Sequence, residues 1–238
     1  MKDTRTLGEP VGDWTPPRAP DWQVLDGAHA RLEKLEPDAH AARLFPAYEG
    51  HDWVWDYLPY GPFSSAAQYH RWMRDAVAGA DPYFFAVYDK AARTYGGVGS
   101  YLRITPQAGS IELGHLNFAP CLQHSRAATE AFFLTMQWAF DAGYRRFEWK
   151  CDALNLPSRR AAQRLGLSYE GVFRQAAVVK GRNRDTAWFA AIDTDWPALQ
   201  EAFTVWLSDA NFSADGKQRE SLSDLTRLVL VQRDPVLG

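Results

Sequence analysis

The sequence predicts an α/β protein in which helices flank a mixed, mostly antiparallel central sheet of about six to seven strands. Three strand-like segments, Tyr83–Tyr88, Tyr95–Ile104 and Ser110–Phe118, follow one another with only short turns between them, which is typical of an antiparallel meander. A helix-length segment then precedes another strand, Arg146–Asp152. Because a crossover of that length suits parallel strands, we expect the fourth and fifth strands of the chain to lie parallel and splayed.

Composition excludes several classes of protein. The 238 residues carry a net charge of −3, which argues against a nucleic-acid partner, since binding phosphates needs clustered Lys and Arg. No apolar run approaches the ~20 residues that span a bilayer, and the first residues lack the apolar stretch of a signal peptide. The two cysteines, Cys121 and Cys151, stand far apart without a CxxC motif, so we expect no disulfide framework and no metal site. These observations predict a cytoplasmic protein without a membrane partner.

The chain divides into three predicted parts. Residues 1–29 are rich in Gly and Pro and are expected to form an irregular N-terminal arm. Residues 30–193 hold all the predicted strands and form the main domain. Residues 194–238 are expected to form a helical tail packed on that domain, with a helix at Trp196–Leu207 and an amphipathic piece at Leu222–Val231.

The remaining elements of the main domain follow from local patterns. A first strand is predicted at Ala30–Leu35 and a helix at 38–45, and Ser64 or Ser65 is expected to cap a second helix. Further elements are expected, in chain order, at Arg126–Asp141 (a buried helix), Arg159–Leu165 (a helix), and Gly171–Lys180 with Asp185–Ile192 (a hairpin).

An aromatic segment at residues 51–62 carries Trp53, Trp55, Tyr57 and Tyr60 and fits neither a long helix nor a long strand. We expect a loop with one helical turn. Two interpretations stay open. The aromatics form a hydrophobic latch on the core, which is the commoner use of such side chains, or they form one wall of a substrate pocket.

A possible anion site follows the fourth strand, at the start of the long helix. Gln123, Ser125 and Arg126 stand where a helix has free backbone N–H groups and the positive end of its dipole. This arrangement suits a ligand that carries phosphate groups.

Two motifs give the sequence a family resemblance. The segment Gln123-His-Ser-Arg-Ala-Ala128 is similar to the phosphate loop Q/R-x-x-G-x-G/A of the GNAT superfamily of acyl-CoA-dependent N-acyltransferases, with Arg126 in place of a glycine. The block from Asn155 and Ser158 to Glu170-Gly171 resembles the Asn-x-x-Ser…Glu-Gly block of the RimJ/RimL branch. The resemblance spans roughly 30–192 and implies the α+β-like GNAT fold.

This resemblance implies a function and a cofactor. The function is transfer of an acetyl group from acetyl-CoA directly to a primary amine, either a protein N-terminus or a small molecule, with succinyl-CoA as an alternative donor. The strand around Leu116 and Phe118 would pair with the pantetheine arm. The residues implied to bind the cofactor are Leu116, Phe118, Gln123, His124, Ser125, Arg126, Ala127, Ala128, Asn155, Ser158 and Arg159.

Several of these residues have a plain structural interpretation as well. Asn155 and Ser158 are residue types that cap helices, and Arg159 and Arg160 suit a solvated helix face. Both interpretations stay open for Asn155 and Ser158, since one residue can serve as a cap and as a ligand.

Acyl transfer needs a group that takes a proton from the amine and one that returns a proton to the leaving thiolate. Glu112 is the preferred base, with His115 and Asp152 as other candidates, and Ser158 is implied as the proton donor. Neither cysteine has a recognisable His partner, which disfavours a covalent enzyme intermediate. The absence of G-x-S-x-G and H-E-x-x-H motifs disfavours a hydrolase or metalloenzyme. A non-catalytic acyl-CoA-binding module is the alternative function, and the sequence leaves open whether the chain forms a homo-oligomer.

Overall fold

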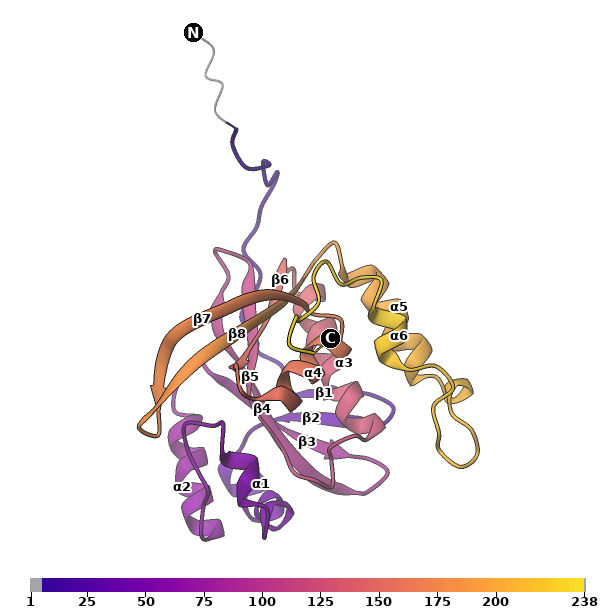
Figure 1. The fold of residues 1–238 in the computed structure, drawn as a ribbon. Helices are drawn as coiled ribbons and strands as arrows, with labels where there is room; N and C mark the ends of the chain where they lie inside the picture. The colour runs from indigo at the N-terminus through magenta and orange to yellow at the C-terminus, as the bar shows by residue number, and fades with distance from the viewer. Residues whose placement is uncertain (1–5, 238) are drawn as a thin grey trace.

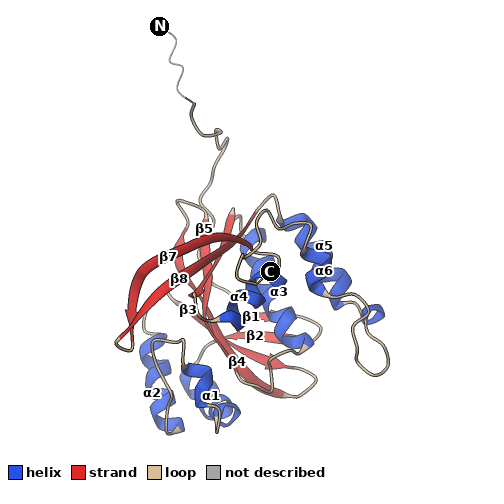
Figure 2. Ribbon diagram, in the orientation of Figure 1, coloured by secondary structure: helices blue, strands red, loops and turns tan. Residues whose placement is uncertain are grey.

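In the computed structural model, which describes residues 6–237, eight strands form one sheet in the order β1-β2-β3-β4-β5-β6-β8-β7 (Figures 1 and 2). The pair β5 and β6 is parallel, and every other neighbouring pair is antiparallel. The mixed, mostly antiparallel sheet is therefore confirmed. The strands are β1 (Val24–Asp26), β2 (Ala30–Lys34), β3 (Tyr83–Asp89), β4 (Thr94–Thr105), β5 (Ser110–Phe118), β6 (Arg146–Asp152), β7 (Ser168–Val179) and β8 (Arg182–Ile192).

The eighth strand is one more than the sequence predicted, and it lies in the segment expected to be irregular. Strand β1 has only three residues and pairs with β2. A residue of helix α3 (Arg126–Asp141) stabilises the turn between them: the buried Glu130 carboxylate accepts hydrogen bonds from the backbone amides of Ala28, His29 and Ala30. No local pattern in the sequence could indicate a strand that depends on a carboxylate about a hundred positions away.

Two groups of helices cover the sheet. Alternate residues of a strand point to opposite faces, so Phe85 of β3 packs in one apolar cluster with residues of α3 and α5, and Phe84 packs in another with residues of α1 and α2. Figure 2 shows α1 and α2 together at one side of the sheet, away from α3 to α6. The helices are α1 (Pro37–Leu44), α2 (Ala66–Ala76), α3 (Arg126–Asp141), α4 (Leu156–Arg164), α5 (Trp196–Leu207) and α6 (Leu222–Thr226), with one-turn 3₁₀ helices η1 (Phe45–Tyr48), η2 (Asp52–Trp55) and η3 (Asp209–Asn211).

Several element boundaries differ from the sequence-based prediction, among them the start of β7, which lies at Ser168 rather than at Gly171. Helix α4 begins at Leu156 rather than at Arg159, because the Asn155 side chain caps it and proline occupies its first turn. Strand β8 begins at Arg182 rather than at Asp185, since the hairpin turn is tighter than expected. Of the amphipathic piece after Leu222, only Leu222–Thr226 is helical.

The segment after residue 193 packs closely on the rest of the chain. Leu199 and Phe203 of α5 are fully buried, and Trp196 stacks on Phe140 of α3 with ring centroids 4.9 Å apart. The division of the chain at residues 29 and 193 stays a prediction. No helix within residues 6–237 is both long and apolar enough to cross a membrane.

Candidate active site

The middle of the sheet contains a gap between its two parallel strands. Residues Ser110–Leu113 of β5 pair with Arg146–Trp149 of β6, and the pairing ends there. Strand β5 continues to Phe118 alongside β4, while β6 continues to Asp152 alongside β8. The two strands therefore diverge, and the β6 side of the last part of β5 is left without a strand partner.

A β-bulge in β5 marks the start of the divergence. Asn117 pairs with Val98 and Gly114 with Ser100, so β5 has one residue more than β4 between these two pairs. His115 lies in the bulge and has a φ of +50°, a left-handed conformation that is uncommon for residues other than glycine. Its imidazole Nδ1 is hydrogen-bonded to the Tyr60 hydroxyl at 3.1 Å. The bulge thus aims His115 at the aromatic segment that precedes α2.

The environment of His115 keeps its ring uncharged. Burial, with smaller contributions from the charges of Arg103 and Arg184, lowers the pKa of His115 to about 4. Burial also raises the pKa of the Tyr60 phenol. At neutral pH the two hydrogen-bonded side chains are both neutral, so His115 offers a lone pair rather than a positive charge.

Glu112, the base preferred from the sequence, lies in a chain of ion pairs. Its carboxylate contacts the Nε of Arg103 at 2.7 Å and the Nζ of Lys150 at 2.9 Å, and its side chain is only 3% exposed. Lys150 also contacts Glu148 at 2.7 Å and lies 3.7 Å above the ring of Trp188. Glu112 is therefore a buried carboxylate matched by two cations rather than an exposed residue of the strand.

At the α3 end of the gap, the predicted phosphate loop presents main-chain groups. Ser125 caps α3 by accepting the amide of Ala128 at 2.9 Å. The amides of the two residues between them, Arg126 and Ala127, have no acceptor within residues 6–237. This is expected for the first turn of a helix. The side chain of Gln123 bonds the Phe118 carbonyl at 2.7 Å. Two free amides at a helix N-terminus form an anion site made of backbone alone.

Other residues of this loop shape it rather than project from it. His124 has a φ of +60°, which turns the chain into the helix. Ala127 and Ala128 are small and buried. Leu116 and Phe118 point to the face of the sheet that α3 covers, where Phe118 stacks on Phe132 with ring centroids 5.2 Å apart.

Arg126, the departure from the family pattern, turns toward the C-terminal segment. Its Nη2 donates to the Leu207 carbonyl at 2.7 Å and to Asp209 at 2.9 Å, and its guanidinium lies over the ring of Phe212. The side chain that replaces the usual glycine is therefore held outside the loop.

The opposite wall of the gap is the start of α4. Asn155 accepts the amide of Ser158 at 3.1 Å, so it caps the helix as its residue type predicts. The Ser158 oxygen accepts the indole N–H of Trp149 at 3.0 Å, which leaves the hydroxyl hydrogen free to donate. Burial raises the pKa of the nearby Cys151 thiol to about 11, so Cys151 is not a thiolate at neutral pH.

Arg159, expected on a solvated helix face, is buried instead. Its guanidinium forms two hydrogen bonds of 2.6 Å with the carboxylate of Asp234 and a third, of 2.7 Å, with the Ala153 carbonyl. The exposed fractions of the Arg159 and Asp234 side chains are 3% and 0%. The structure therefore does not bring Arg159 to the cofactor loop, and its side chain joins α4 to the C-terminal segment. Its neighbour Arg160 is exposed, as predicted.

The aromatic segment spans the mouth of the gap and serves in part as a latch. Trp55 is buried against Tyr48 and other rings of the α1–α2 cluster, whereas Trp53 is 54% exposed. Tyr57 donates to the Leu154 carbonyl at 3.2 Å, and Tyr60 contacts His115. The Nζ of Lys180 in the β7–β8 turn donates to the Trp55 carbonyl at 2.9 Å. One loop thus contacts both walls of the gap and the hairpin.

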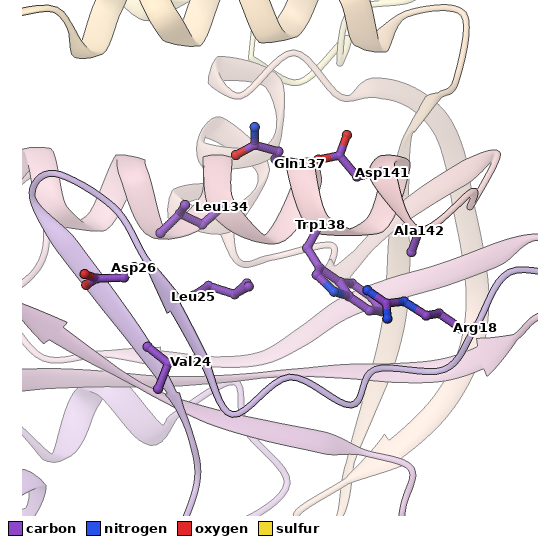
Figure 3. Close-up of a pocket in the computed structure, with 9 residues that line it drawn as sticks. All are labelled: Arg18, Val24, Leu25, Asp26, Leu134, Gln137, Trp138, Asp141 and Ala142. Atoms are coloured by element: carbon purple, nitrogen blue, oxygen red, sulfur yellow. The ribbon is translucent and has the colours of Figure 1, made fainter.

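The structure has a separate cavity of about 370 Å³ between β1 and the second half of α3. Figure 3 shows Leu25, Leu134 and Trp138 pointing into the space between the strand and the helix, with Arg18 close to Trp138. None of the predicted site residues lines this cavity. Within residues 6–237 no group of three or more His, Cys, Asp or Glu side chains is placed to hold a metal ion.

Comparisons with known proteins agree with this geometry. Residues 29–168 match the model of the acetyltransferase (GNAT) domain. The chain belongs to the GNAT family. It is similar to a GCN5-related N-acetyltransferase from Brucella melitensis, with 43% identity and a TM-score of 0.88 over 90% of this chain and 99% of that chain. A probable GNAT acetyltransferase from Chromobacterium violaceum has 37% identity and a TM-score of 0.77 over 83% and 100% of the two chains.

A more distant GNAT structure supports the fold alone. RimL, a ribosomal L7/L12 alpha-N-protein acetyltransferase solved in complex with coenzyme A, has 18% identity and a TM-score of 0.62 over 71% of this chain and 98% of that chain. A search of curated proteins finds no significant match. The resemblance to the GNAT superfamily stated from the sequence is confirmed, and with it the identification of this chain as a GNAT acetyltransferase that uses an acyl-CoA.

Several residues at this GNAT site escaped the sequence analysis. Lys150 and Trp188 are neighbours only through the pairing of β6 with β8, and Asp234 reaches Arg159 from the far end of the chain. Arg184 was assigned to a turn but lies in β8. The one available signal was the charge at alternate positions of β6, where Arg146, Glu148 and Lys150 share a face.

Proposed function

We propose that the protein transfers an acetyl group from acetyl-CoA to a primary amine in one step, without an acyl-enzyme. The observation that carries this proposal is the gap between β5 and β6, which has a backbone anion site at one end and neutral, aromatic and charged side chains at the other. An acyl-CoA supplies an activated thioester. The amine nitrogen bonds to the acyl carbon, the carbon–sulfur bond breaks, and a proton passes from the amine to the departing thiolate.

The donor would be held mainly by main-chain groups. The amides of Arg126 and Ala127 and the positive end of α3 would hold the pyrophosphate. The unpartnered side of β5 from Gly114 to Phe118 would bind the amides of the pantetheine arm as an added strand would. These groups are present without rearrangement of the described residues, which supports the fit of an acyl-CoA.

Proton transfer would use His115 and Ser158. The Glu112 carboxylate already contacts Arg103 and Lys150. Protonation of this carboxylate would break both ion pairs. His115 is neutral and lies at the divergence of the strands, so it is the better candidate to accept the amine proton, directly or through a water molecule. Ser158 retains a free hydroxyl hydrogen that could pass to the thiolate. We assign Glu112 to fixing Arg103 and Lys150 beside the gap.

The acceptor would enter from the side of the aromatic segment. Tyr57 and Tyr60 contact the two walls of the gap, and Trp53 is exposed beside them. A protein N-terminal amine has a pKa near 7.7–8.0 and is partly neutral at physiological pH, which suits a site that offers only a weak base. Small amines of similar pKa meet the same requirement.

The test is release of free CoA from acetyl-CoA with a panel of peptides and small amines, in parallel with calorimetric binding of acetyl-CoA. Turnover with at least one amine is the expected result. Tight binding without turnover of any amine would instead identify a binding module. Faster turnover with succinyl-CoA than with acetyl-CoA would identify a transferase of a larger acyl group.

A further inference from the structure

Arg184 of β8 differs from the other arginines around the gap because no acceptor satisfies it. Its Nε is buried, and within residues 6–237 this atom has no hydrogen-bond partner and no carboxylate forms an ion pair with the side chain. By contrast, Arg103 pairs with Glu112, Arg146 with Glu148 and Glu170, and Arg159 with Asp234. A buried donor without an acceptor is costly, so among these four arginines Arg184 would gain most from an acceptor that a ligand supplies.

The strand register places Arg184 beside the gap, just past the end of β6. Thr186 pairs with Asp152, the last residue of β6, so Arg184 lies one pair beyond the point where β6 ends. It shares a face with Thr186 and Trp188, because strand residues alternate. The ring of Trp188 lies under Lys150, which contacts Glu112, so this is the face that carries the charged side chains of the site. Arg184 is also close enough to His115 on the opposite wall to influence its protonation.

Two acidic residues close to Arg184 in the strand register, Asp185 and Asp152, are engaged with other partners. Asp185 follows Arg184 in β8 and points to the other face, where its carboxylate accepts the Gln175 amide at 2.7 Å and the Asn183 side chain at 2.9 Å. Asp152 on β6 is engaged with the Leu154 amide at 2.9 Å. The positive charge of Arg184 therefore remains available to a ligand in the gap.

An apolar surface with one further free donor lies next to this cation. Trp188 packs on Phe173 with ring centroids 4.6 Å apart, and its indole N–H is buried without an acceptor within the described residues. Phe173 is 57% exposed. The combination of a cation, an unpaired N–H and exposed aromatic rings suits a substrate that carries both an apolar part and a carboxylate.

We propose that Arg184 binds a carboxylate group of one of the two substrates, so that the enzyme prefers an anionic substrate over its neutral counterpart. This inference rests on the proposed transferase function. The carboxylate belongs either to the acyl group, as in a dicarboxylic acyl-CoA such as succinyl-CoA, or to the acceptor, as in an amino acid. The chemistry of recognition is the same in the two cases, and the kinetic comparison below separates them.

The experiment compares two matched pairs of substrates. One pair is succinyl-CoA and acetyl-CoA with a single amine that has no carboxylate. The other is phenylalanine and phenylalanine amide with acetyl-CoA. We expect the wild-type kcat/KM to favour the carboxylate member of one pair by at least about tenfold, the effect of one charge-assisted hydrogen-bonded contact. The pair that shows the preference identifies which substrate carries the carboxylate.

The variant Arg184→Gln should abolish this preference, so that kcat/KM for the carboxylate member no longer exceeds kcat/KM for the neutral member. Arg174→Gln is the matched control, because Arg174 is an exposed arginine of the same hairpin, and it should keep the preference. A preference that survives in Arg184→Gln, or a wild type that prefers neither carboxylate, would overturn the proposal. A thermal melt of each variant checks that it is folded.

The proposal also has a test that does not need turnover. Calorimetry would compare the binding of succinyl-CoA with that of acetyl-CoA, and the binding of N-acetylphenylalanine with that of its amide in the presence of CoA. A carboxylate preference that Arg184→Gln removes would support the role of Arg184 even if no amine were acetylated, which would count only against the proposed function. Equal binding within both pairs would overturn the inference about Arg184.

Discussion

The two ends of the gap between β5 and β6 offer a ligand different kinds of group, backbone amides at one end and side chains at the other. At the α3 end, the groups available to a ligand are the amides of Arg126 and Ala127, while the side chains of Gln123, Ser125 and Arg126 are engaged elsewhere. At the opposite end, the available groups are side chains, among them His115, Tyr60 and Arg184. A site made of backbone amides tolerates changes of side chain, whereas a site made of side chains depends on each one.

This difference explains how an arginine can occupy a position where the family pattern has a glycine. Arg126 contributes its amide to the loop and sends its guanidinium to Asp209 and Phe212. The α3 end, which we propose binds the acyl donor (the donor end), thus keeps its free amides through a change in sequence. The opposite end, which we propose binds the amine (the acceptor end), is where specificity is expected to reside. The following variants test that contrast, from the largest expected effect to the smallest.

The wall of the donor end is expected to depend on one distant ion pair. Asp234→Ala leaves the buried guanidinium of Arg159 without its partner and should lower the free energy of unfolding by about 3–5 kcal/mol, measured by urea denaturation. The KM for acetyl-CoA should rise, because α4 carries Asn155 and Ser158.

Asp209→Ala is the matched control, since Asp209 pairs with Arg126 but its side chain is 91% exposed, and it should change little. Replacing the Arg159–Asp234 pair by Met and Leu should recover much of the lost stability. Equal stability of Asp234→Ala and wild type would show that the C-terminal segment does not support α4.

The acceptor end should be sensitive to single side chains. We expect His115→Asn to lower kcat by about a hundredfold or more, as loss of a general base does, with little change in the KM for acetyl-CoA. Asparagine tolerates the positive φ at this position better than most residues. Glu112→Gln should lower kcat less and destabilise the fold more. The reverse ranking in steady-state assays would restore Glu112 as the base.

The same histidine predicts a pH dependence of stability. The pKa of His115 is lowered from 6.5 to about 4 in the folded protein, so between these values the unfolded chain binds a proton that the folded chain does not. Stability should therefore be full above pH 6.5 and fall toward pH 4, by roughly 2 kcal/mol after allowance for partial exposure. The stability difference between wild type and His115→Asn, followed by urea titration, should shrink over this window, and a constant difference would contradict the assignment.

At the donor end, a side chain should matter mainly through its charge. Ser125→Asp keeps a good N-cap and should leave the melting temperature nearly unchanged, but it places a negative charge beside the free amides. We expect about a tenfold rise in the KM for acetyl-CoA, or about 1.4 kcal/mol. Ser125→Asn is the neutral control and should resemble wild type. If both variants bind acetyl-CoA normally, the pyrophosphate lies elsewhere.

The smallest effect is expected at Arg126. Because its guanidinium points to the C-terminal segment, Arg126→Ala should change the KM for acetyl-CoA by less than about threefold. A much larger loss of acetyl-CoA binding would mean that the guanidinium leaves Asp209 to bind the phosphates, and the contrast between the two ends would then fail.

The sequence predicted the local structure of the proposed donor end better than that of the proposed acceptor end, for a physical reason. Ser125 and Asn155 cap helices through neighbours only three residues away, so a short motif contains the whole structure. The environment of Lys150 depends on the pairing of three strands. The lack of an ion-pair partner for Arg184 depends on the register of the β7–β8 hairpin. Such relationships are set by the folded sheet and leave little trace in the local pattern.

The fold was predictable for the same reason, with its exceptions at long-range contacts. The meander and the parallel pair follow from turn lengths and from one crossover helix. Strand β1 was missed because Glu130 of α3 holds its turn. Trp55 lies in a segment with an ambiguous pattern, and only the packing of α1 and α2 shows that it is buried.

The bond between Arg159 and Asp234 also affects the order in which the enzyme becomes competent during its synthesis. Strands β5 and β6, helix α3 and the phosphate loop are complete long before Asp234 leaves the ribosome. Until then the guanidinium of Arg159 has no counter-charge, and Tyr169 lacks the Gln232 carbonyl that its amide meets in the folded chain. A chain synthesised only as far as α4 would thus have the proposed anion site without a fixed α4, and we expect firm retention of acyl-CoA only once Asp234 has joined the fold.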